Sequence, residues 1–92
     1  MKREVIGTSL INGEGVAAAD SVVCRYYITE PEPGVFGIEV EKTQSGNVVE
    51  TSRVYDVCRA ADRAHEIAVT LMENTVTPMT LHDILYDITA DG

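Results

Sequence analysis

The stretch from Ala60 to Asp87 most constrains the fold, because it holds the chain's only long helical pattern. The apolar residues that recur there at three- and four-residue steps are Ala60, Ala61, Ala64, Ile67, Ala68, Leu71 and Met72. Charged residues occupy most of the remaining positions, which predicts one amphipathic helix with a face of small side chains. Asn74 then favours a left-handed helix end.

A second, shorter helix is predicted to start at about Pro78. Thr77 supplies an N-cap, and a proline suits the first helical position because its missing N–H has no partner there anyway. The spacing places Leu81, Ile84, Leu85 and Ile88 inward, and Asp83, Asp87 and Asp91 outward.

The residues before this stretch have the patterns of β-strands and turns. Arg3 to Ile11 mixes β-branched and aliphatic residues, and Val16 to Asp20 is interpreted as an irregular link. Two segments alternate with period two, and their predicted inward positions are Val22, Cys24, Tyr26 and Ile28, then Phe36, Ile38 and Val40. The proline- and glycine-containing segment from Glu30 to Gly34 separates them as a hairpin turn.

The predicted last strand, Val48 to Val57, follows the turn Ser45-Gly46-Asn47 and is less clearly sided. Its apolar residues fall on both faces, so either a bulge shifts its register or both faces are partly covered. The element order predicts an α+β domain spanning residues 1–92: an antiparallel β-meander of three to four strands with two C-terminal α-helices packed on one face.

Composition and charge restrict the function. The 92 residues carry a formal charge of −8, which argues against nucleic acid or an anionic membrane as a partner. The sequence has no apolar run long enough to span a membrane and no signal-peptide core, so we expect a cytoplasmic protein. Cys24 and Cys58 are isolated in sequence and are expected to be structural thiols.

A resemblance rests on Tyr26-Tyr27, on Gly37-Ile38-Glu39-Val40 and above all on the segment from Glu73 to Asp83. That segment contains Val-Thr-Pro followed by Thr-Leu-x-Asp, a pattern that is typical of the start of a helix. With these residues the chain resembles a family of small bacterial proteins known only as a domain of unknown function. The resemblance covers roughly Tyr26 to Asp87 and implies no known activity. The chain departs from the family pattern at Cys58-Arg59-Ala60, where serines are expected to cap the long helix.

Candidate catalytic residues are few. A thiol- or metal-dependent enzyme could use Cys58, His65 and His82, but these residues lack the close ligand spacing of zinc sites. The chain also lacks the common catalytic and phosphate-binding motifs. We therefore expect no catalytic residue, no bound metal and no cofactor, and we expect a non-enzymatic protein-interaction or regulatory module instead.

The expected interaction is with a second copy of the chain or with another protein. A small two-layer domain leaves one sheet face and the sheet edges open, and a homodimer would cover them. After Arg63 the chain has acidic residues but no Lys or Arg, so its helices are expected to present a negative surface that either keeps the protein in solution or binds a partner. The residues of this candidate interaction surface are Val23, Tyr27, Val48, Val54, Asp83 and Asp87.

Overall fold

The computed structural model describes residues 2–10 and 22–90 and contains four strands followed by two helices. Its elements are β1 (Lys2–Leu10), β2 (Val22–Glu32), β3 (Val35–Gln44), β4 (Asn47–Cys58), α1 (Ala61–Glu73), the 3-10 turn η2 (Pro78–Thr80) and α2 (Leu81–Ala90). The predicted link at Val16–Asp20 and the predicted outward position of Asp91 lie outside the described residues.

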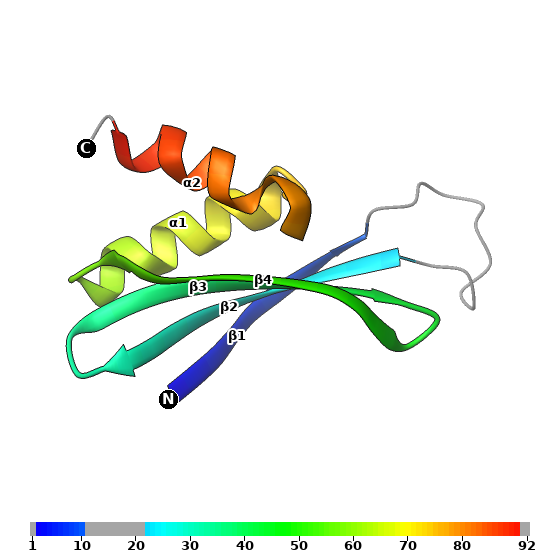
Figure 1. Ribbon diagram of the computed structural model, residues 1–92, viewed down its shortest axis with the longest axis horizontal. Coiled ribbons are helices and arrows are strands. Elements are labelled where there is room, and N and C mark those ends of the chain that lie inside the picture. Colours follow the sequence, from blue (N-terminus) through cyan, green and yellow to red (C-terminus); the bar gives the residue numbers. More distant parts are fainter. Residues whose placement is uncertain (1, 11–21, 91–92) are drawn as a thin grey trace.

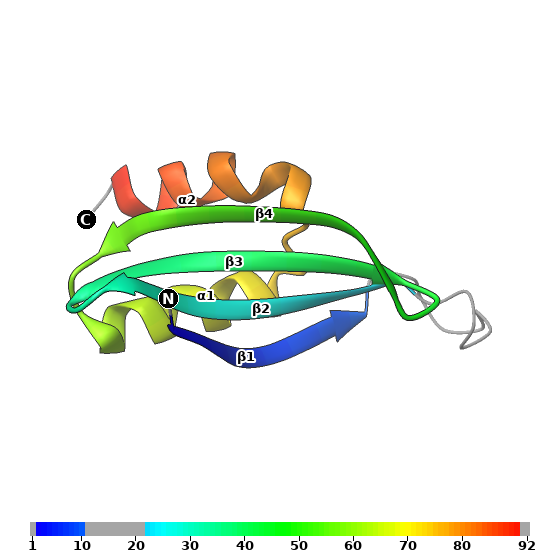
Figure 2. The ribbon, with the colours of Figure 1, turned by 60° about the horizontal axis from the view of Figure 1, so that its bottom comes forward.

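The sheet has the strand order β1-β2-β3-β4, and each neighbouring pair is antiparallel. Both helices lie on the same side of this sheet (Figure 1). Figure 2 shows the opposite face with the four strands in order and the helices behind them. The predicted α+β meander with two C-terminal helices is therefore confirmed.

The core forms between the sheet and the helices because two strands alternate as predicted. Cys24, Tyr26 and Ile28 of β2 and Ile38 and Val40 of β3 are buried. Complete burial of an aliphatic or aromatic side chain stabilises a fold by about 1.5–3 kcal/mol. The core contains a polar anchor, since the Tyr26 hydroxyl donates a 2.8 Å hydrogen bond to the Val76 carbonyl.

Helix α1 presents its small residues to the sheet. Ala64, Ile67, Ala68 and Leu71 are buried, whereas the predicted inward positions Ala60 and Ala61 are exposed at the start of the helix. Ala60 is the N-cap and has no side chain that could accept a hydrogen bond from the first turn. Burial therefore begins one turn later than the spacing predicted.

The joint after α1 is a Schellman motif, and its left-handed residue is Thr75 (φ 54°) rather than Asn74 (φ −95°). The Val76 N–H donates to the Leu71 carbonyl at 3.0 Å, and the Thr75 N–H donates to the Met72 carbonyl at 3.2 Å. The prediction that Asn74 takes this conformation was wrong, because the motif requires it one position later. The chain is thereby turned so that Val76 packs against Leu71 in the core.

Strand β4 contains bulges, which is one of the two alternatives that its sequence pattern allowed. Its register against β3 shifts between Phe36 and Ile38 and again between Lys42 and Thr43. The shifts place Val54 opposite Ile38 on the helix-covered face, and Val48 opposite Thr43 on the uncovered face. Among the described residues, no helix is long and apolar enough to cross a membrane.

Candidate functional site

The uncovered sheet face carries an apolar row at one end. Directly paired residues of an antiparallel sheet share a face, and the pairing Leu10–Val23–Thr43–Val48 crosses all four strands. The two outer members are prominent, since Leu10 is 54% and Val48 55% exposed, while Val23 and Thr43 are half-buried. We call these four residues the apolar row.

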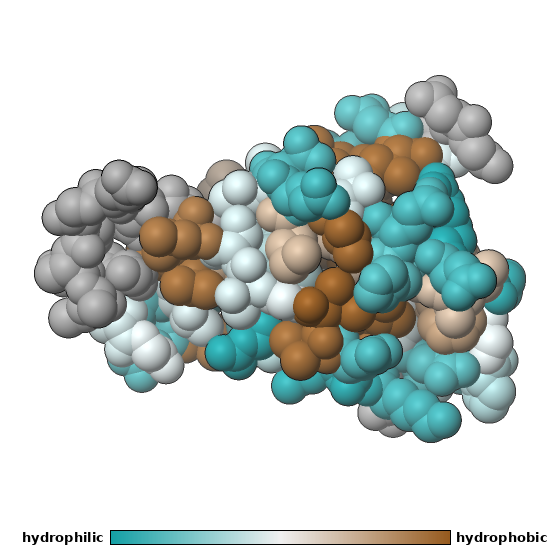
Figure 3. All heavy atoms as spheres, turned by 180° about the vertical axis from the view of Figure 1, so that it is seen from behind, coloured by the Kyte–Doolittle hydropathy of each residue, from teal (hydrophilic) through white to brown (hydrophobic). Residues whose placement is uncertain are grey.

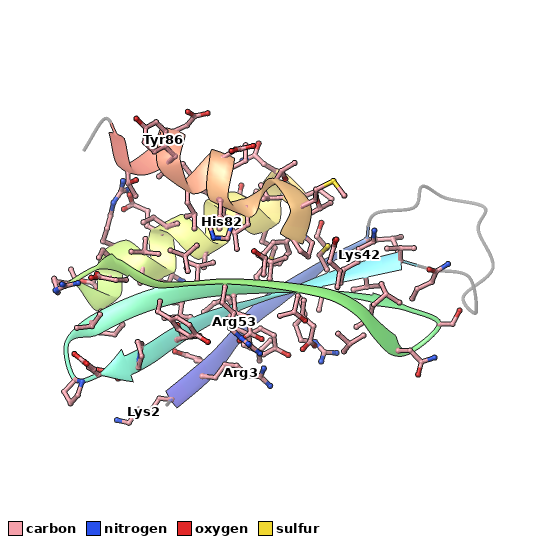
Figure 4. The ribbon with its side chains drawn as sticks, in the orientation of Figure 1. Lys2, Arg3, Lys42, Arg53, His82 and Tyr86 are labelled. Atoms are coloured by element: carbon pink, nitrogen blue, oxygen red, sulfur yellow. The ribbon has the colours of Figure 1, made fainter. Side chains whose placement is uncertain are left out.

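The middle of the same face contains a buried carboxylate between two arginines. Glu39 is completely buried, and its Oε2 and Oε1 atoms accept hydrogen bonds from Arg3 Nη1 at 2.9 Å and Arg53 Nε at 3.0 Å. Figure 4 shows both arginines beneath the sheet, on the side away from the helices. Each guanidinium has further N–H donors beyond the one used here, so the cluster can still bind an anionic or carbonyl oxygen.

An aromatic ring supports this cluster. The Arg3 guanidinium lies 4.2 Å from the centroid of the Tyr27 ring, within the range of a cation–π interaction. The Tyr27 hydroxyl donates to Glu41 at 3.3 Å, and Arg25 Nη1 lies 3.8 Å from the same carboxylate. Opposite charges therefore alternate across the centre of the sheet face.

The six predicted surface residues separate into three groups. Val23 and Val48 are brought together in the apolar row. Tyr27 is only 6% exposed beneath Arg3, and Val54 packs against the core. Neither residue presents an uncovered apolar surface, so this part of the prediction was wrong. Their neighbours in the fold cover them, which the strand alternation alone did not reveal. Asp83 and Asp87 are exposed on α2, on the other side of the molecule.

The three residues of the enzymatic alternative lie apart. Cys58 Sγ is 3.4 Å from the Ala60 carbonyl oxygen, at the turn between β4 and α1. His65 lines a trough on the outer side of α1, whereas His82 lines a groove between α2 and β4 and has its Nδ1 3.4 Å from Ser52 Oγ. Within the described residues, no group of three or more His, Cys, Asp or Glu side chains is placed to hold a metal ion.

The remaining thiol lies in the core. Cys24 is completely buried, and burial raises the pKa of its thiol. A raised pKa keeps the thiol protonated near neutral pH and makes it a poor nucleophile. The expectation that Cys24 lies on the inward strand face is confirmed.

The structure adds residues that the sequence reasoning did not select, namely Leu10, Arg3, Glu39 and Arg53. The apolar-in, acid-out alternation of β3 does place Glu39 on the uncovered face. Its two arginine partners depend on the registers of β1 and β4, which are shifted by bulges. Alternation along one strand therefore shows which face Glu39 is on, whereas the strand pairing shows which arginines lie beside it.

Comparisons with known proteins identify the family of this chain. A search of the curated proteins and a search of the solved structures each found no match. The model of the Family of unknown function (DUF6514) matches residues 8–91. The chain therefore belongs to this uncharacterised family.

Proposed function

We propose that this protein is a non-enzymatic protein-interaction or regulatory module of the bacterial cytoplasm and that it acts as a homodimer. The apolar row on the uncovered sheet face is the observation that carries the proposal. Exposed aliphatic residues at Leu10 and Val48 mark the two ends of this row. The sequence resemblance to small bacterial proteins supports the proposal that the protein is bacterial.

A two-fold axis near the apolar row would bury these residues with one self-complementary surface. Four strands spaced about 4.8 Å apart make a row about 14 Å wide, enough for interdigitating side chains from two copies. Val5 is as exposed as Leu10, but its row across the sheet continues with Tyr27, Glu39 and Arg53 and is therefore largely polar. Seen from behind, the surface has hydrophobic patches among hydrophilic residues (Figure 3). The row is thus the best candidate centre for a dimer.

The charges beside the row are compatible with self-association. Arg25 and Glu41 are directly paired in the neighbouring row, so a second copy can place its carboxylate opposite the arginine and the reverse. The acidic helices lie on the opposite face of the sheet (Figure 1). Repulsion between exposed charges is largely screened beyond about 8–10 Å at physiological salt.

A non-enzymatic role is supported by the chemistry of the candidate groups. The Cys24 thiol is held protonated by burial, and Cys58 has a backbone carbonyl as its hydrogen-bond partner. The arginines of the sheet face are partly neutralised by Glu39 and Glu41. These features suit a binding surface better than a reaction centre.

Light scattering over a tenfold concentration range tests the homodimer. We expect a mass of twice the 10.0 kDa chain at high concentration, and Leu10→Lys or Val48→Lys should shift it towards the single-chain mass. Met79→Lys is the matched control, because Met79 is 81% exposed but lies on the helix side. A constant single-chain mass across the range would refute the homodimer.

A further inference from the structure

An open groove separates the two helices. Helix α1 packs mainly on β1 and β2, whereas α2 packs on β4. The groove between them has a volume of about 360 Å³. Its apolar lining residues are Leu71, Val76, Ile84 and Ile88. Leu71 and Val76 are buried in the core below, so the floor is firmly supported.

The α2 wall of the groove is incompletely covered. Ile84 and Ile88 are four residues apart and therefore lie one above the other on the same side of the helix. Both are partly buried against the core and keep an exposed portion facing the groove. An apolar side chain inserted between the helices would complete their burial.

The rims of the groove are acidic. On α2, the helical repeat places Asp87 and Asp83 next to the isoleucine stripe on its outer side, and both are exposed. On α1, Thr70 lines both the groove and an adjoining trough of about 550 Å³. The charged lining residues of that trough are Asp62, Glu66 and Glu73, joined by His65.

Little positive charge offsets these carboxylates. The sequence has no Lys or Arg after Arg63. Arg63 Nη1 lies 2.5 Å from Glu66 and offsets that residue, whereas in the described part of the chain Asp83 and Asp87 take part in no ion pair. Asp83 lies in the first turn of α2, where the helix dipole favours a negative charge. Asp87, four residues later, is repelled by Asp83, and the last turn of this helix contains no basic residue. A cation bound beside the two aspartates would relieve their repulsion.

We propose that this groove binds a basic amphipathic helix of a partner protein. Apolar side chains at helical spacing enter between Ile84, Ile88 and Leu71, while Lys or Arg residues on the flanks of that helix reach Asp87 and the carboxylates of the α1 trough. This is the helix-in-groove mode of recognition, in which apolar anchors give affinity and charges give orientation. The inference rests on the proposed role as an interaction module and names its partner class, on the face opposite the apolar row.

A designed peptide tests the groove. The probe is a fluorescent helix of about 18 residues with Leu on one face and Lys on the other, titrated into the full chain. We expect saturable binding that weakens as salt is raised from about 0.05 to 0.5 M. A peptide with the same composition but scrambled Leu positions, and one with Glu in place of Lys, should bind much more weakly.

Variants locate the binding site. Asp83→Asn combined with Asp87→Asn should weaken binding about three- to tenfold, the effect of removing two exposed charge pairs. Glu4→Gln combined with Glu32→Gln is the matched control, because both residues are exposed and lie on the strands. Ile88→Ser tests the apolar α2 wall and should weaken binding more, with circular dichroism checking that the variant is folded.

Several results would overturn the inference and leave the homodimer intact. They are equal binding of the scrambled peptide, no loss of affinity in the double aspartate variant, or NMR shift changes centred on Arg3 and Arg53 instead of Ile84 and Ile88. If a second copy filled the groove, Ile88→Ser would reduce the mass measured by light scattering, which would also reject a heterologous helix. Leu10→Lys should change the mass without changing peptide affinity, so the two proposals fail separately.

Discussion

At the scale of single residues, Glu39 shows how a charge is stabilised on a sheet face that no helix covers. Its carboxylate is fully buried beneath its own neighbours, with hydrogen bonds from Arg3 on the first strand and Arg53 on the last. Both arginines are themselves 44% exposed, so their charges stay solvated while they shield the carboxylate. The cluster ties both edge strands to β3 through side chains as well as backbone.

Replacement of this carboxylate should destabilise the fold. We expect Glu39→Ala to lower the free energy of unfolding by about 1–3 kcal/mol, since two charge-assisted hydrogen bonds are lost from partly exposed arginines. Urea denaturation measures this loss. Glu41→Ala is the control, because its contacts with Tyr27 and Arg25 are longer, at 3.3 and 3.8 Å. A larger loss for Glu41→Ala would contradict this account.

At the scale of elements, β4 is the strand whose shape decides the surfaces of the molecule. Its bulge opposite Phe36–Ile38 brings its backbone close to β3 at Gly37. A Cβ at Gly37 would lie 2.3 Å from the Val54 carbonyl oxygen and 2.8 Å from the Tyr55 Cα. The absence of a side chain at this position therefore allows the bulge, which places Val54 under α2.

The bulge predicts a difference between two glycines. Gly37→Ala should destabilise the protein by about 2–3 kcal/mol or more, because backbone atoms of β4 must move. Gly46→Ala is the matched control: no atom beyond its two chain neighbours lies within 4 Å of its Cβ position, and only its positive φ of 82° opposes alanine, at about 1 kcal/mol. Thermal unfolding of both variants provides the comparison. Equal losses would show that β4 does not pack on Gly37 as described.

At the scale of the whole molecule, the two faces have opposite character. The uncovered sheet face carries arginines paired with carboxylates and an apolar row, whereas the helix side carries unpaired acids beside an apolar groove. Figure 4 shows Arg3 and Arg53 below the sheet and Tyr86 on the outer side of α2. The two sides of this chain, whose formal charge is −8, thus differ in chemistry.

The free energy of unfolding of the whole domain should decrease as the pH becomes alkaline. Burial raises the folded-state pKa of both Cys24 and Tyr26 above their ordinary values of 9.0 and 10.0. The unfolded chain therefore releases these protons first as pH rises. The stabilising contribution is fully present below the ordinary values and is lost above them, by at most about 1.4 kcal/mol per pH unit for each group.

Urea denaturation at about pH 8 and about pH 10.5 measures this dependence. Cys24→Ala should show a smaller decrease between the two values than the unmodified chain, because one of the two linked protons has been removed. Tyr26→Phe tests the other group and also lacks the hydrogen bond to Val76. Equal stability at both pH values in the unmodified chain would contradict the assignment of these groups to the core.

The sequence by itself determined the element order, the antiparallel pairing and the inward faces of β2, β3 and both helices. These features follow from local periodicity and from turn-forming residues, which act over a few neighbours along the chain. The helix joint was located correctly for the same reason, but Pro78–Thr80 forms a 3-10 turn ahead of α2, and Thr77 makes no side-chain capping hydrogen bond. Its left-handed residue was displaced by one, because propensity favoured Asn74 while the Schellman hydrogen bonds fixed Thr75.

Tertiary structure alone decided which side chains remain uncovered. The sequence could not show that Tyr27 lies beneath Arg3, that Val54 lies beneath α2, or that Leu10 and Val48 end one row. Each depends on strand register, and a bulge of one residue exchanges the two faces of a strand. The groove between α1 and α2 likewise depends on where each helix rests on the sheet, which is a property of packing between distant segments.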